Sequence, residues 1–506
     1  MNKASILQTS FPHAKLAALQ VRITQLVTDS RLIKAGDTFV AFPGEKNDGR
    51  QHIAAAIAQG ANAVIYEAGN FEWDAQWQLP HLAVQDLRRK TGDLADVVYG
   101  KPTEKLWMVG VTGTNGKTST THWIAQALSD AHRSCALIGT LGNGHIGALQ
   151  ETANTTPEAI QVHKLCAGYL REGAKAMAME VSSHALDQGR IDGVRFDVAL
   201  MTNLSRDHLD YHGDMASYAA SKRKFFDVNT LRYAVLNLDD ATGSEWAESL
   251  QREGVEVIAY GLSDAALKRA QDLNLRMVYG HLLQMTDTGL SLGIHSSWGT
   301  ARLESHLVGR FNAENLLGVL AVLLVSDIAL EVAVESLSHV QAVAGRMQRL
   351  GGKALPTVIV DYAHTPDALE KVLHTLREMM QTKGGSLVCV FGCGGNRDTG
   401  KRPLMGKAAA RLADRSIVTS DNPRDEDPVA IIDQITAGMR DDKHQVIVDR
   451  AAAIYSAIAH AQPGDTVLIA GKGHEQYQEV AGVKHAFSDI DVAQHALQHW
   501  PLEVRA

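Results

Sequence analysis

The feature that most constrains the fold is an alternation of short apolar strands with helical stretches through the middle and last thirds of the 506-residue chain. The predicted strands are 107–111, 176–179, 198–201 and 234–236 in the middle of the chain, and 358–360, 387–391, 417–419, 446–448 and 467–470 in the last third. Helical segments such as 118–131, 366–381 and 451–461 lie between them. Strands that are apolar along their whole length are typical of parallel sheets covered by helices on both faces. The alternation therefore predicts an α/β protein.

The length predicts about three domains at the usual ~150 residues each. Turn signals at 35–37 and 43–49 separate short strands in the first part of the chain, and a strand with a glycine-rich turn opens the central part at 107–118. A stretch with three glycines and a proline at 343–356 is typical of a hinge between two α/β units. We predict boundaries near residues 86 and 343, which gives domains of 1–86, 87–343 and 344–506.

Composition and charge exclude several classes of protein. Hydrophobic residues make up 45% of the chain and charged residues 21%, which excludes a mainly disordered protein. The net charge of −8 argues against nucleic acid or an anionic membrane as the main partner, because both require a basic face. The N-terminus lacks the apolar core of a signal peptide, and the longest apolar run, 316–325, is too short to span a bilayer. We therefore expect a cytoplasmic protein that does not insert into membranes.

The four cysteines, Cys135, Cys166, Cys389 and Cys393, are too few for a disulfide framework. Cys389 and Cys393 lie close together in sequence, but no second pair accompanies them as a zinc site would require. We expect four reduced thiols, as is usual in the cytosol.

The strongest motif is GVTGTNGKTST at residues 110–120, where an apolar strand enters a glycine-rich turn followed by a helical segment. Glycines let backbone N–H groups close around phosphate oxygens, and a helix N-terminus adds positive potential. In such a loop Lys117 reaches the terminal phosphates and the Thr118 hydroxyl binds Mg²⁺. The usual pattern requires glycine at position 111, which is valine here, whereas Gly110 lies one position earlier. The alternative is a glycine turn in a Rossmann-like unit, and nucleotide binding alone does not identify the reaction.

Polar residues after the next two predicted strands are candidate ligands for the same cation. Glu180 ends a strand, a position that lines the ligand crevice of parallel sheets, and carboxylates bind Mg²⁺. His208 lies among acidic residues whose oxygens favour Mg²⁺ over zinc. From the residues alone, Glu180 fits a solvated strand end equally well, and His208 fits a polar loop equally well. For Lys222 the residues alone favour a charged, solvated helix face, and only a family resemblance makes it a candidate ligand.

Eight motifs occur in order along the chain: TGTNGKT, EVSSHAL, NLSRDHLDYHG, GRFNAEN, DYAHTPDAL, FGCGGNRDTGKRP, DNPR and GKGHE. Together they resemble the Mur ligase family, from DSR at 29–31 to near residue 485, and most closely its members that add the third peptide residue. That family also shows the shifted glycine of the phosphate loop. The resemblance implies an N-terminal UDP-binding α/β domain, a central P-loop ATPase α/β domain with a parallel sheet, and a C-terminal Rossmann-like domain for the incoming amino acid.

The resemblance further implies an ATP-dependent amide ligase of peptidoglycan synthesis. Such an enzyme joins meso-2,6-diaminopimelate to the D-Glu carboxylate of UDP-N-acetylmuramoyl-L-alanyl-D-glutamate through an acyl phosphate, releasing ADP and phosphate. ATP and Mg²⁺ are the implied cofactors. The implied partners are these small-molecule substrates, without nucleic acid or membrane, and we expect a monomer.

The matching motifs imply roles for individual residues. The implied catalytic residues are Lys117, Glu180, His208 and Lys222, and the implied metal ligands are Thr118, Glu180, His208 and a carbamylated Lys222. The implied ATP contacts are Gly113, Thr114, Asn115, Gly116, Lys117, Thr118, Ser119, Asn312, Arg346 and Asp361. The implied contacts to the UDP-muramoyl-dipeptide are Thr28, Ser30, Glu45, Lys46, Asn47, Asn154, Thr155, Thr156, Ser182, Gln188 and Arg190. A CO₂ adduct explains a lysine at a metal site, because it turns the ammonium into a carboxylate-like anion.

The choice of amino acid depends on DNPR at 421–424. Arg424 can form a bidentate pair with a carboxylate, and a point charge cannot reproduce that fork. In the family, diaminopimelate-adding members carry arginine here and lysine-adding members generally do not. The implied diaminopimelate contacts are Arg397, Asp421, Asn422, Pro423, Arg424, Gly471 and Glu475, with Glu475 suited to the distal ammonium. Taken alone, DNPR fits a polar turn before a helix equally well.

Three other functions fit parts of the pattern. Another Mur step or a folylpolyglutamate synthetase would share the phosphate loop, but DNPR and GKGHE argue against both. A P-loop switch or transporter ATPase would release phosphate without an acceptor amine, and no subunit-coupling motif is visible. A non-catalytic scaffold has no reason to retain the set Lys117, Glu180, His208, Lys222 and Asp361.

Overall fold

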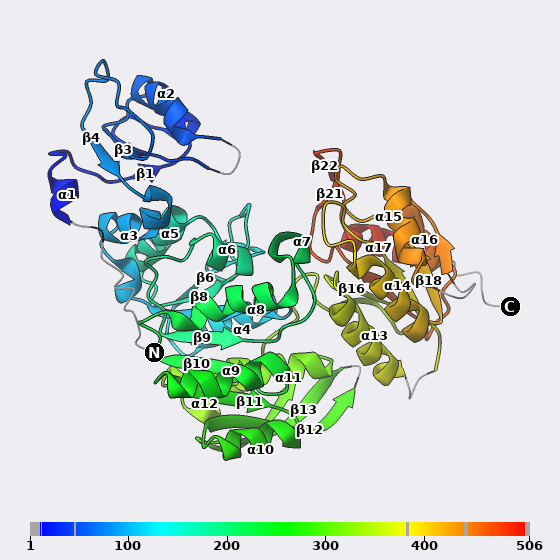
Figure 1. Cartoon of the computed structure of the whole chain (residues 1–506). Helices are drawn as coiled ribbons and strands as arrows, with labels where there is room; N and C mark the ends of the chain where they lie inside the picture. The colour runs from blue at the N-terminus through cyan, green and yellow to red at the C-terminus, as the bar shows by residue number, and fades with distance from the viewer. Residues whose placement is uncertain are drawn as a thin grey trace. The chain divides into compact units, whose positions relative to one another are not determined.

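The computed structural model describes residues 11, 13–44, 47–286, 288–380, 384–439 and 444–500 (Figure 1). Three α/β domains follow one another along the chain, built on a parallel N-terminal sheet, a mixed central sheet and a mostly parallel C-terminal sheet. By compactness the chain divides into two units: Met1–Gly110, His132–Ala199 and Lys224–Arg232 form the first, and Val111–Ala131, Leu200–Arg223 and Tyr233–Ala506 form the second. The α/β class predicted from the alternation is confirmed.

The N-terminal sheet has the strand order β1-β2-β3-β4, and all neighbouring strands are parallel. Its elements are α1 (His13–Ala17), β1 (Leu26–Val27), β2 (Thr38–Ala41), α2 (Ile53–Ala58), β3 (Ala63–Glu67), β4 (His81–Val84) and α3 (Leu87–Val98). Strand β2 is buried at every position because its side chains enter two apolar clusters in turn. Val40 joins one cluster with Leu87, and Phe39 joins the other with Ile53. The sheet is therefore covered on both faces.

The central sheet has the strand order β14-β13-β12-β11-β10-β9-β5-β8-β6-β7. Its strands are β5 (Trp107–Thr112), β6 (Cys135–Gly139), β7 (Gly142–Gly144), β8 (Ala176–Glu180), β9 (Val198–Met201), β10 (Tyr233–Asn237), β11 (Glu256–Gly261), β12 (Arg276–Thr286), β13 (Gly289–Ser296) and β14 (Gly299–Ser305). Its helices are α4 (Lys117–Asp130), α5 (Ala159–Arg171), α6 (Ser183–Asp187), α7 (Leu209–His212), α8 (Met215–Arg223), α9 (Ala241–Arg252), α10 (Asp264–Asp272), α11 (Arg310–Val325) and α12 (Leu330–Ser338).

The central sheet, expected to be parallel, is mixed, with antiparallel strands at both ends. Strands β12, β13 and β14 pair antiparallel, and so do β6 and β7. Only Ser297 and Trp298 separate β13 from β14. A connection of two residues joins antiparallel neighbours, whereas a parallel pair needs a crossover of a dozen or more residues. Short connections therefore make the β12–β13–β14 end of this sheet an antiparallel meander.

Helix α11 accounts for the longest apolar run of the sequence. All residues from 316 to 325 are buried, and the helix packs against β10, β11 and β12. A helix that is apolar on all sides suits the core of a large domain. Among the described residues, no helix is long and apolar enough to cross a membrane.

The C-terminal sheet has the strand order β15-β16-β20-β17-β18-β19, parallel except for the pair β15–β16. Its elements are β15 (Gln348–Gly351), β16 (Thr357–Asp361), α13 (Pro366–Met380), β17 (Leu387–Phe391), α14 (Lys401–Leu412), β18 (Arg415–Val418), α15 (Pro428–Thr436), β19 (His444–Val446), α16 (Arg450–Ala459), β20 (Thr466–Ala470) and α17 (Asp489–Gln498). A separate hairpin, β21 (Tyr477–Val480) with β22 (Val483–Ala486), follows β20. Strand β15 lies inside the stretch that the sequence presents as a hinge.

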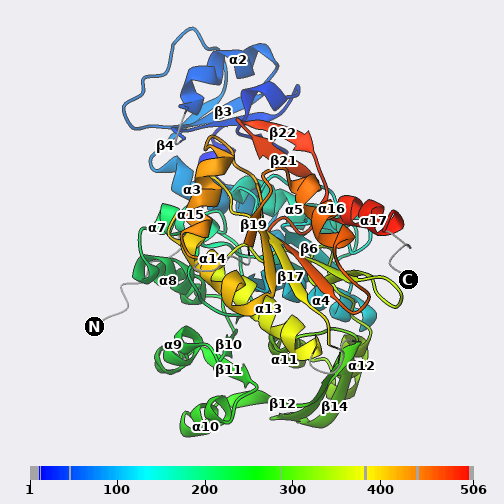
Figure 2. The same cartoon turned by 90° about the vertical axis from the view of Figure 1, so that its right-hand side faces the viewer.

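Helices cover both faces of the C-terminal sheet (Figure 2), and alternate side chains of its strands enter two different cores. Cys389 and Phe391 of β17 pack with helices α13, α14 and α15, whereas Val388 and Val390 pack with α16 and α17. This period of two explains why the strand is apolar at every position.

All four cysteines are buried free thiols, which confirms the absence of disulfides. Burial raises the pKa of Cys135, Cys166 and Cys393 to about 12. These thiols are therefore protonated at neutral pH and serve as small apolar core residues.

Candidate nucleotide and amino-acid sites

The phosphate loop lies where β5 ends and α4 begins. Gly116 is the N-cap of α4 with a φ of 86°, and Gly113 has a φ of 147°. A Cβ atom on Gly113 would collide with Thr202 Oγ1, and one on Gly116 would lie 2.7 Å from Asn315 Oδ1. Both positions therefore require glycine for backbone conformation and for space. The first helical turn adds buried Thr118 and Ser119.

The shifted glycine has a packing explanation. Gly110 lies inside β5, and a Cβ atom there would collide with the ring of Phe225 and come within 2.8 Å of Phe196 Cε1. The two rings pack edge to face, with centroids 4.9 Å apart. Gly110 therefore makes room for aromatic side chains, while Gly113 and Gly116 shape the loop.

Two lysines donate hydrogen bonds to the same carbonyl oxygen. Lys117 Nζ donates to Gly113 O and Thr114 O at 2.9 Å each, and Lys222 Nζ donates to Gly113 O at 2.9 Å. Lys222 is 1% exposed and its Nζ lies 4.8 Å from the centroid of the Tyr218 ring. Burial, together with the positive charge of Lys117, holds the pKa of Lys222 well below its usual range. The interpretation of Lys222 as a solvated residue is therefore wrong, and its surroundings favour the neutral amine over the ammonium.

Two predicted ATP contacts, Arg346 and Asp361, come from the C-terminal part of the chain, and Arg346 contacts the phosphate loop. Arg346 Nη2 donates to Thr118 Oγ1 at 3.2 Å, and its guanidinium lies 4.3 Å from the centroid of the Tyr362 ring. Asp361 accepts hydrogen bonds from Met347 N at 2.7 Å and Ala363 N at 2.8 Å. Burial raises the pKa of Asp361, and the charge of Arg346 opposes this effect.

The remaining residues of the predicted ATP site are held by local contacts. Asn115 Nδ2 donates to Asp367 Oδ2 at 3.1 Å, and Thr114 Oγ1 lies 3.2 Å from the Tyr218 hydroxyl. Asn312 is buried at the start of α11, where its Nδ2 donates to Val308 O at 2.8 Å.

Asp207, next to the predicted ligand His208, connects three loops. Its carboxylate lies 3.3 Å from His208 Nε2, 3.6 Å from His364 Nε2 and 3.7 Å from Lys401 Nζ. Burial alone would raise the pKa of Asp207, but the hydrogen bond with His364 and the nearby charges hold it well below its usual range. Beside it, Arg206 forms a two-bond pair with Asp398 at 2.9 and 3.0 Å. Loops of the DYAHTP and GGNRDTGK motifs are thereby fixed to the loop of His208.

Glu180 is fully buried at the end of β8, so the solvated strand end is wrong. Its carboxylate accepts hydrogen bonds from Thr140 N at 2.8 Å and Thr140 Oγ1 at 3.1 Å. Thr140 Oγ1 also lies 3.0 Å from Thr155 Oγ1, and Thr156 Oγ1 donates to Glu180 O at 2.8 Å. A side chain at Gly139 would collide with this carboxylate. Glu180 therefore ends in a polar cluster.

Three more of the predicted dipeptide contacts belong to the same cluster. Thr156 Oγ1 lies 3.3 Å from Ser182 Oγ, and Arg190 Nη1 donates to Thr156 O at 3.0 Å. Arg190 Nε also donates to Gln188 Oε1 at 2.9 Å. Asn154 is exposed, and its carbonyl accepts a hydrogen bond from Thr152.

The predicted uridine contacts lie in the N-terminal domain. Thr28 is exposed directly after β1, and Ser30 is buried in a short 3₁₀ turn, Ser30–Leu32. Asn47 is exposed, and its carbonyl accepts a hydrogen bond from Gly44 N at 2.8 Å. Glu45 and Lys46 lie outside the described residues.

The DNPR loop meets the GKGHE motif at the carboxyl ends of β18 and β20. Asn422 Nδ2 donates to Glu475 Oε2 at 2.8 Å. Lys472, which is fully buried, donates to Asn422 Oδ1 and to Glu475 Oε2 at 2.9 Å each. A side chain at Gly471 would collide with Asp421 Oδ2. DNPR is therefore part of a polar cluster and more than a surface turn.

Two arginines flank this cluster. Arg424 Nη1 donates to Gly395 O at 2.8 Å, and Arg424 Nε lies 3.3 Å from Glu479 Oε2. Arg450 is fully buried and donates to Asp489 at 2.8 and 2.7 Å and to Ala470 O at 3.0 Å. Its Nη1 also lies 3.9 Å from Asp421 Oδ2. The last described helix, α17, is thus linked to the strand ends that carry the cluster.

The other two predicted contacts have local partners: Pro423 O accepts a hydrogen bond from Glu426 N, and Arg397 Nη1 donates one to Asn396 O.

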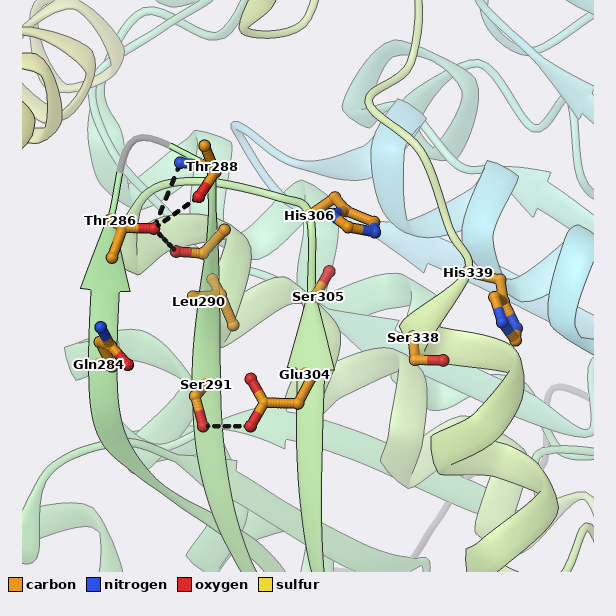
Figure 3. A pocket seen from close by; sticks show the side chains of 11 residues that line it. Gln284, Thr286, Thr288, Leu290, Ser291, Glu304, Ser305, His306, Ser338 and His339 are labelled. Atoms are coloured by element: carbon orange, nitrogen blue, oxygen red, sulfur yellow. Dashed lines mark hydrogen bonds between the residues drawn. The ribbon is translucent and has the colours of Figure 1, made fainter.

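Two hollows open on the second unit. One of about 580 Å³ is lined by Arg397, Asp398, Thr399 and residues of the loop from Arg206 to Met215, so it includes a predicted amino-acid contact. The other, of about 510 Å³, lies where the hairpin of β12 and β13 meets β14 and the end of α12 (Figure 3). Small polar side chains such as Thr286, Ser291 and Ser305 line it, and no predicted site residue is among them.

Comparisons with known proteins match successive parts of the chain to domains of one family. Residues 22–99 match the Mur ligase family catalytic domain, residues 111–323 the Mur ligase middle domain, and residues 345–473 the Mur ligase glutamate ligase domain. A Chromobacterium violaceum protein named UDP-N-acetylmuramoyl-L-alanyl-D-glutamate--2,6-diaminopimelate ligase is 49% identical over 488 residues, 96% of this chain and 97% of the relative. The chain belongs to the Mur ligase family.

Two further relatives of this Mur ligase carry the same name. A protein of Nitrosomonas europaea is 46% identical over 491 residues, covering 95% of this chain and 94% of the relative. A solved structure is 36% identical with a TM-score of 0.65, covering 94% of this chain and 95% of the other.

Sequence motifs miss several polar residues of this Mur ligase. Thr140 holds Glu180, Asp207 joins three loops, and Lys472 holds Asn422 and Glu475. Lys472 lies inside GKGHE, so its motif was visible, whereas Thr140 follows β6 without a motif. These residues act on other side chains far along the chain, which a local pattern does not reveal.

Proposed function

We propose that the chain is an ATP-dependent ligase that joins meso-diaminopimelate to UDP-N-acetylmuramoyl-L-alanyl-D-glutamate in peptidoglycan synthesis. The observation that carries this proposal is 49% identity over nearly the full length to a ligase of that name. The phosphate loop and the cluster of Asn422, Arg424 and Glu475 supply the chemistry that such a reaction requires. The reaction uses ATP and releases ADP and phosphate.

The chemistry explains why ATP is needed. A carboxylate is a poor acyl donor, so the D-Glu carboxylate first attacks the γ-phosphorus of ATP, and ADP leaves. The amine of the amino acid then attacks the acyl phosphate carbonyl, an amide bond forms, and phosphate departs with its electron pair. The phosphoryl group carries negative charge throughout, so positive groups and N–H donors lower the barrier. The glycine loop and Lys117 provide these groups.

Mg²⁺ fits the donor types of the proposed ligands. Thr118 offers a hydroxyl, Glu180 a carboxylate and His208 an imidazole, and Lys222 offers oxygen donors once carbamylated. Among the described residues, no three His, Cys, Asp or Glu side chains form a metal-binding group. This fits a cation held partly by phosphate oxygens and by Thr118 and Lys222. When bound, the cation would neutralise phosphate charge.

Lys222 is suited to carbamylation. Burial and the charge of Lys117 lower its pKa and so favour the neutral amine, whose lone pair can attack the carbon of CO₂ while the proton released passes to solvent. We expect protein equilibrated with ¹³C-bicarbonate to show a carbamate resonance by ¹³C NMR. Lys222→Ala should abolish that signal, whereas Lys224→Ala, at a half-exposed lysine paired with Asp187, should retain it. A signal of equal size in Lys222→Ala would refute the assignment.

The other predicted contacts complete the proposed substrate sites. We assign the UDP end to Thr28, Ser30 and the loop 45–47, and the dipeptide end to the Glu180 cluster with Asn154. Asn312, Arg346 and Asp361 would contact ATP from the central and C-terminal domains. The boundaries near residues 86 and 343, the monomeric state and the cytoplasmic location remain part of this proposal.

A phosphate-release assay separates this function from its alternatives. We expect ATP and the UDP-muramoyl-dipeptide to give sustained phosphate release only when meso-diaminopimelate is added, and much less with L-lysine. A P-loop switch would release phosphate without any acceptor, and a scaffold would release none. Equal rates with and without the acceptor would contradict the proposal.

A further inference from the structure

The β21–β22 hairpin is fastened to the DNPR loop through the backbone. Glu479 N donates to Asn422 Oδ1 at 2.9 Å, and Arg424 N donates to Glu479 O at 3.1 Å. Ala481 N donates to Arg424 O at 2.7 Å, and Gln478 Nε2 donates to Asp421 O at 2.7 Å. Residues 421–424 therefore move with this hairpin as one piece.

The Arg424 side chain is held on two sides. The residue has a φ of 51°, in the left-handed region that a non-glycine residue adopts only when its surroundings fix it. Nη1 donates to Gly395 O at 2.8 Å, and Nε lies 3.3 Å from Glu479 Oε2. A Cβ atom at Gly394 would lie 2.9 Å from Nη1, so the guanidinium lies close to the backbone at this glycine.

These contacts use specific donors of the guanidinium. Of its five N–H groups, one on Nη1 donates to Gly395 O, while Nε forms an ion pair with Glu479 Oε2 at 3.3 Å. The outer edge of the fork, between Nη1 and Nη2, carries one N–H of each nitrogen, and the second N–H of Nη2 lies on the Nε side. That edge can still bind a carboxylate through two parallel hydrogen bonds.

We propose that Glu479 is a positioning residue that selects meso-diaminopimelate by holding the Arg424 fork toward the distal carboxylate. The inference rests on the proposed function and adds a specificity determinant to it. Glu479 acts through its oxygen acceptor, because an added negative charge by itself would repel the substrate carboxylate. Its backbone is bonded to Asn422 and Arg424, so the side chain travels with the loop and is not displaced by substrate.

L-Lysine lacks the distal carboxylate, which makes it an internal control. Without Glu479, the Arg424 guanidinium would sample other rotamers. Binding of diaminopimelate would then have to order this side chain, and the lost conformational entropy would weaken binding. Binding of lysine would not change, because no group of lysine pairs with the Arg424 fork.

The experiment measures phosphate release by Glu479→Ala, Glu479→Gln, Arg424→Ala and the double variant Glu479→Ala/Arg424→Ala, with meso-diaminopimelate and with L-lysine. We expect Glu479→Ala to raise KM for diaminopimelate about tenfold, equivalent to ~1.4 kcal/mol, with kcat within about twofold. Glu479→Gln keeps the acceptor and should stay within about threefold of the unaltered KM. In the Arg424→Ala background, Glu479→Ala should have no further effect.

Glu370→Ala is the matched control, because Glu370 also pairs with an arginine, Arg411, within the C-terminal domain. It should leave KM for diaminopimelate unchanged. An unchanged or lower KM in Glu479→Ala would overturn the inference, and so would equal losses with diaminopimelate and lysine or a Glu479→Gln variant as weak as the alanine. If the unaltered chain released no phosphate in response to diaminopimelate, the proposed function itself would fail, and this inference with it.

Discussion

Replacing Lys117 with alanine is expected to lower kcat by about three orders of magnitude, because one preorganised donor at a developing charge contributes ~10²–10³ and lysine adds a full positive charge. The Lys117 ammonium donates hydrogen bonds to Gly113 O and Thr114 O, so these two carbonyls of the phosphate loop already hold it in place. The reaction transfers a phosphoryl group whose charge this ammonium would offset. The measurement is the initial rate of phosphate release at saturating substrates.

Two variants sharpen this test. Lys407→Ala removes an exposed lysine of α14 and should leave the rate unchanged. Lys117→Arg keeps the charge but changes its shape and should recover only part of the rate, because the loop packs closely against Thr202 and Asn315. A Lys117→Ala variant that couples the two substrates at the unaltered rate would contradict the assignment of the loop.

Replacing Arg424 with alanine is expected to raise KM for meso-diaminopimelate about 100-fold, since two charge-assisted hydrogen bonds together contribute ~3 kcal/mol. The preference for diaminopimelate over L-lysine should fall by the same factor, because lysine has no distal carboxylate. Arg424→Lys should not restore the preference, since an ammonium does not offer two parallel donors. The measurement is the ratio of kcat/KM for the two amino acids.

The control for Arg424 is Arg411→Ala, which breaks an ion pair with Glu370 elsewhere in the same domain. It should leave the ratio unchanged. If Arg424→Ala kept the preference for diaminopimelate over lysine, the specificity assigned to DNPR would be wrong.

The parallel part of the fold could be predicted from local pattern. The predicted strands 198–201 and 387–391 coincide with β9 and β17, because strands buried on both faces are apolar at every position. The meander β12–β13–β14 was missed, because only three of the eleven residues of β12 are buried and its sequence mixes apolar and polar residues. Its partners are set by short turns rather than by any apolar run.

The candidate sites likewise have a part that local motifs predict and a part that only the folded chain reveals. GKT predicts a phosphate loop because backbone, lysine and hydroxyl lie within a few residues of one another. Lys222 could not be recognised as buried, since its neighbours Arg223 and Lys224 suggest a charged surface. The bond from Lys472 to Asn422 spans 50 residues, so only the folded chain reveals it.

The buried pair of Arg450 and Asp489 has a consequence for biosynthesis. Asp489 begins the final helix, and its partner Arg450 also contacts Ala470 O and Asp421 beside the DNPR loop. Until that helix has emerged from the ribosome, Arg450 would be a buried charge without its carboxylate, which is strongly unfavourable. The DNPR loop is therefore expected to reach its final structure only after α17 has been synthesised, well after the phosphate loop.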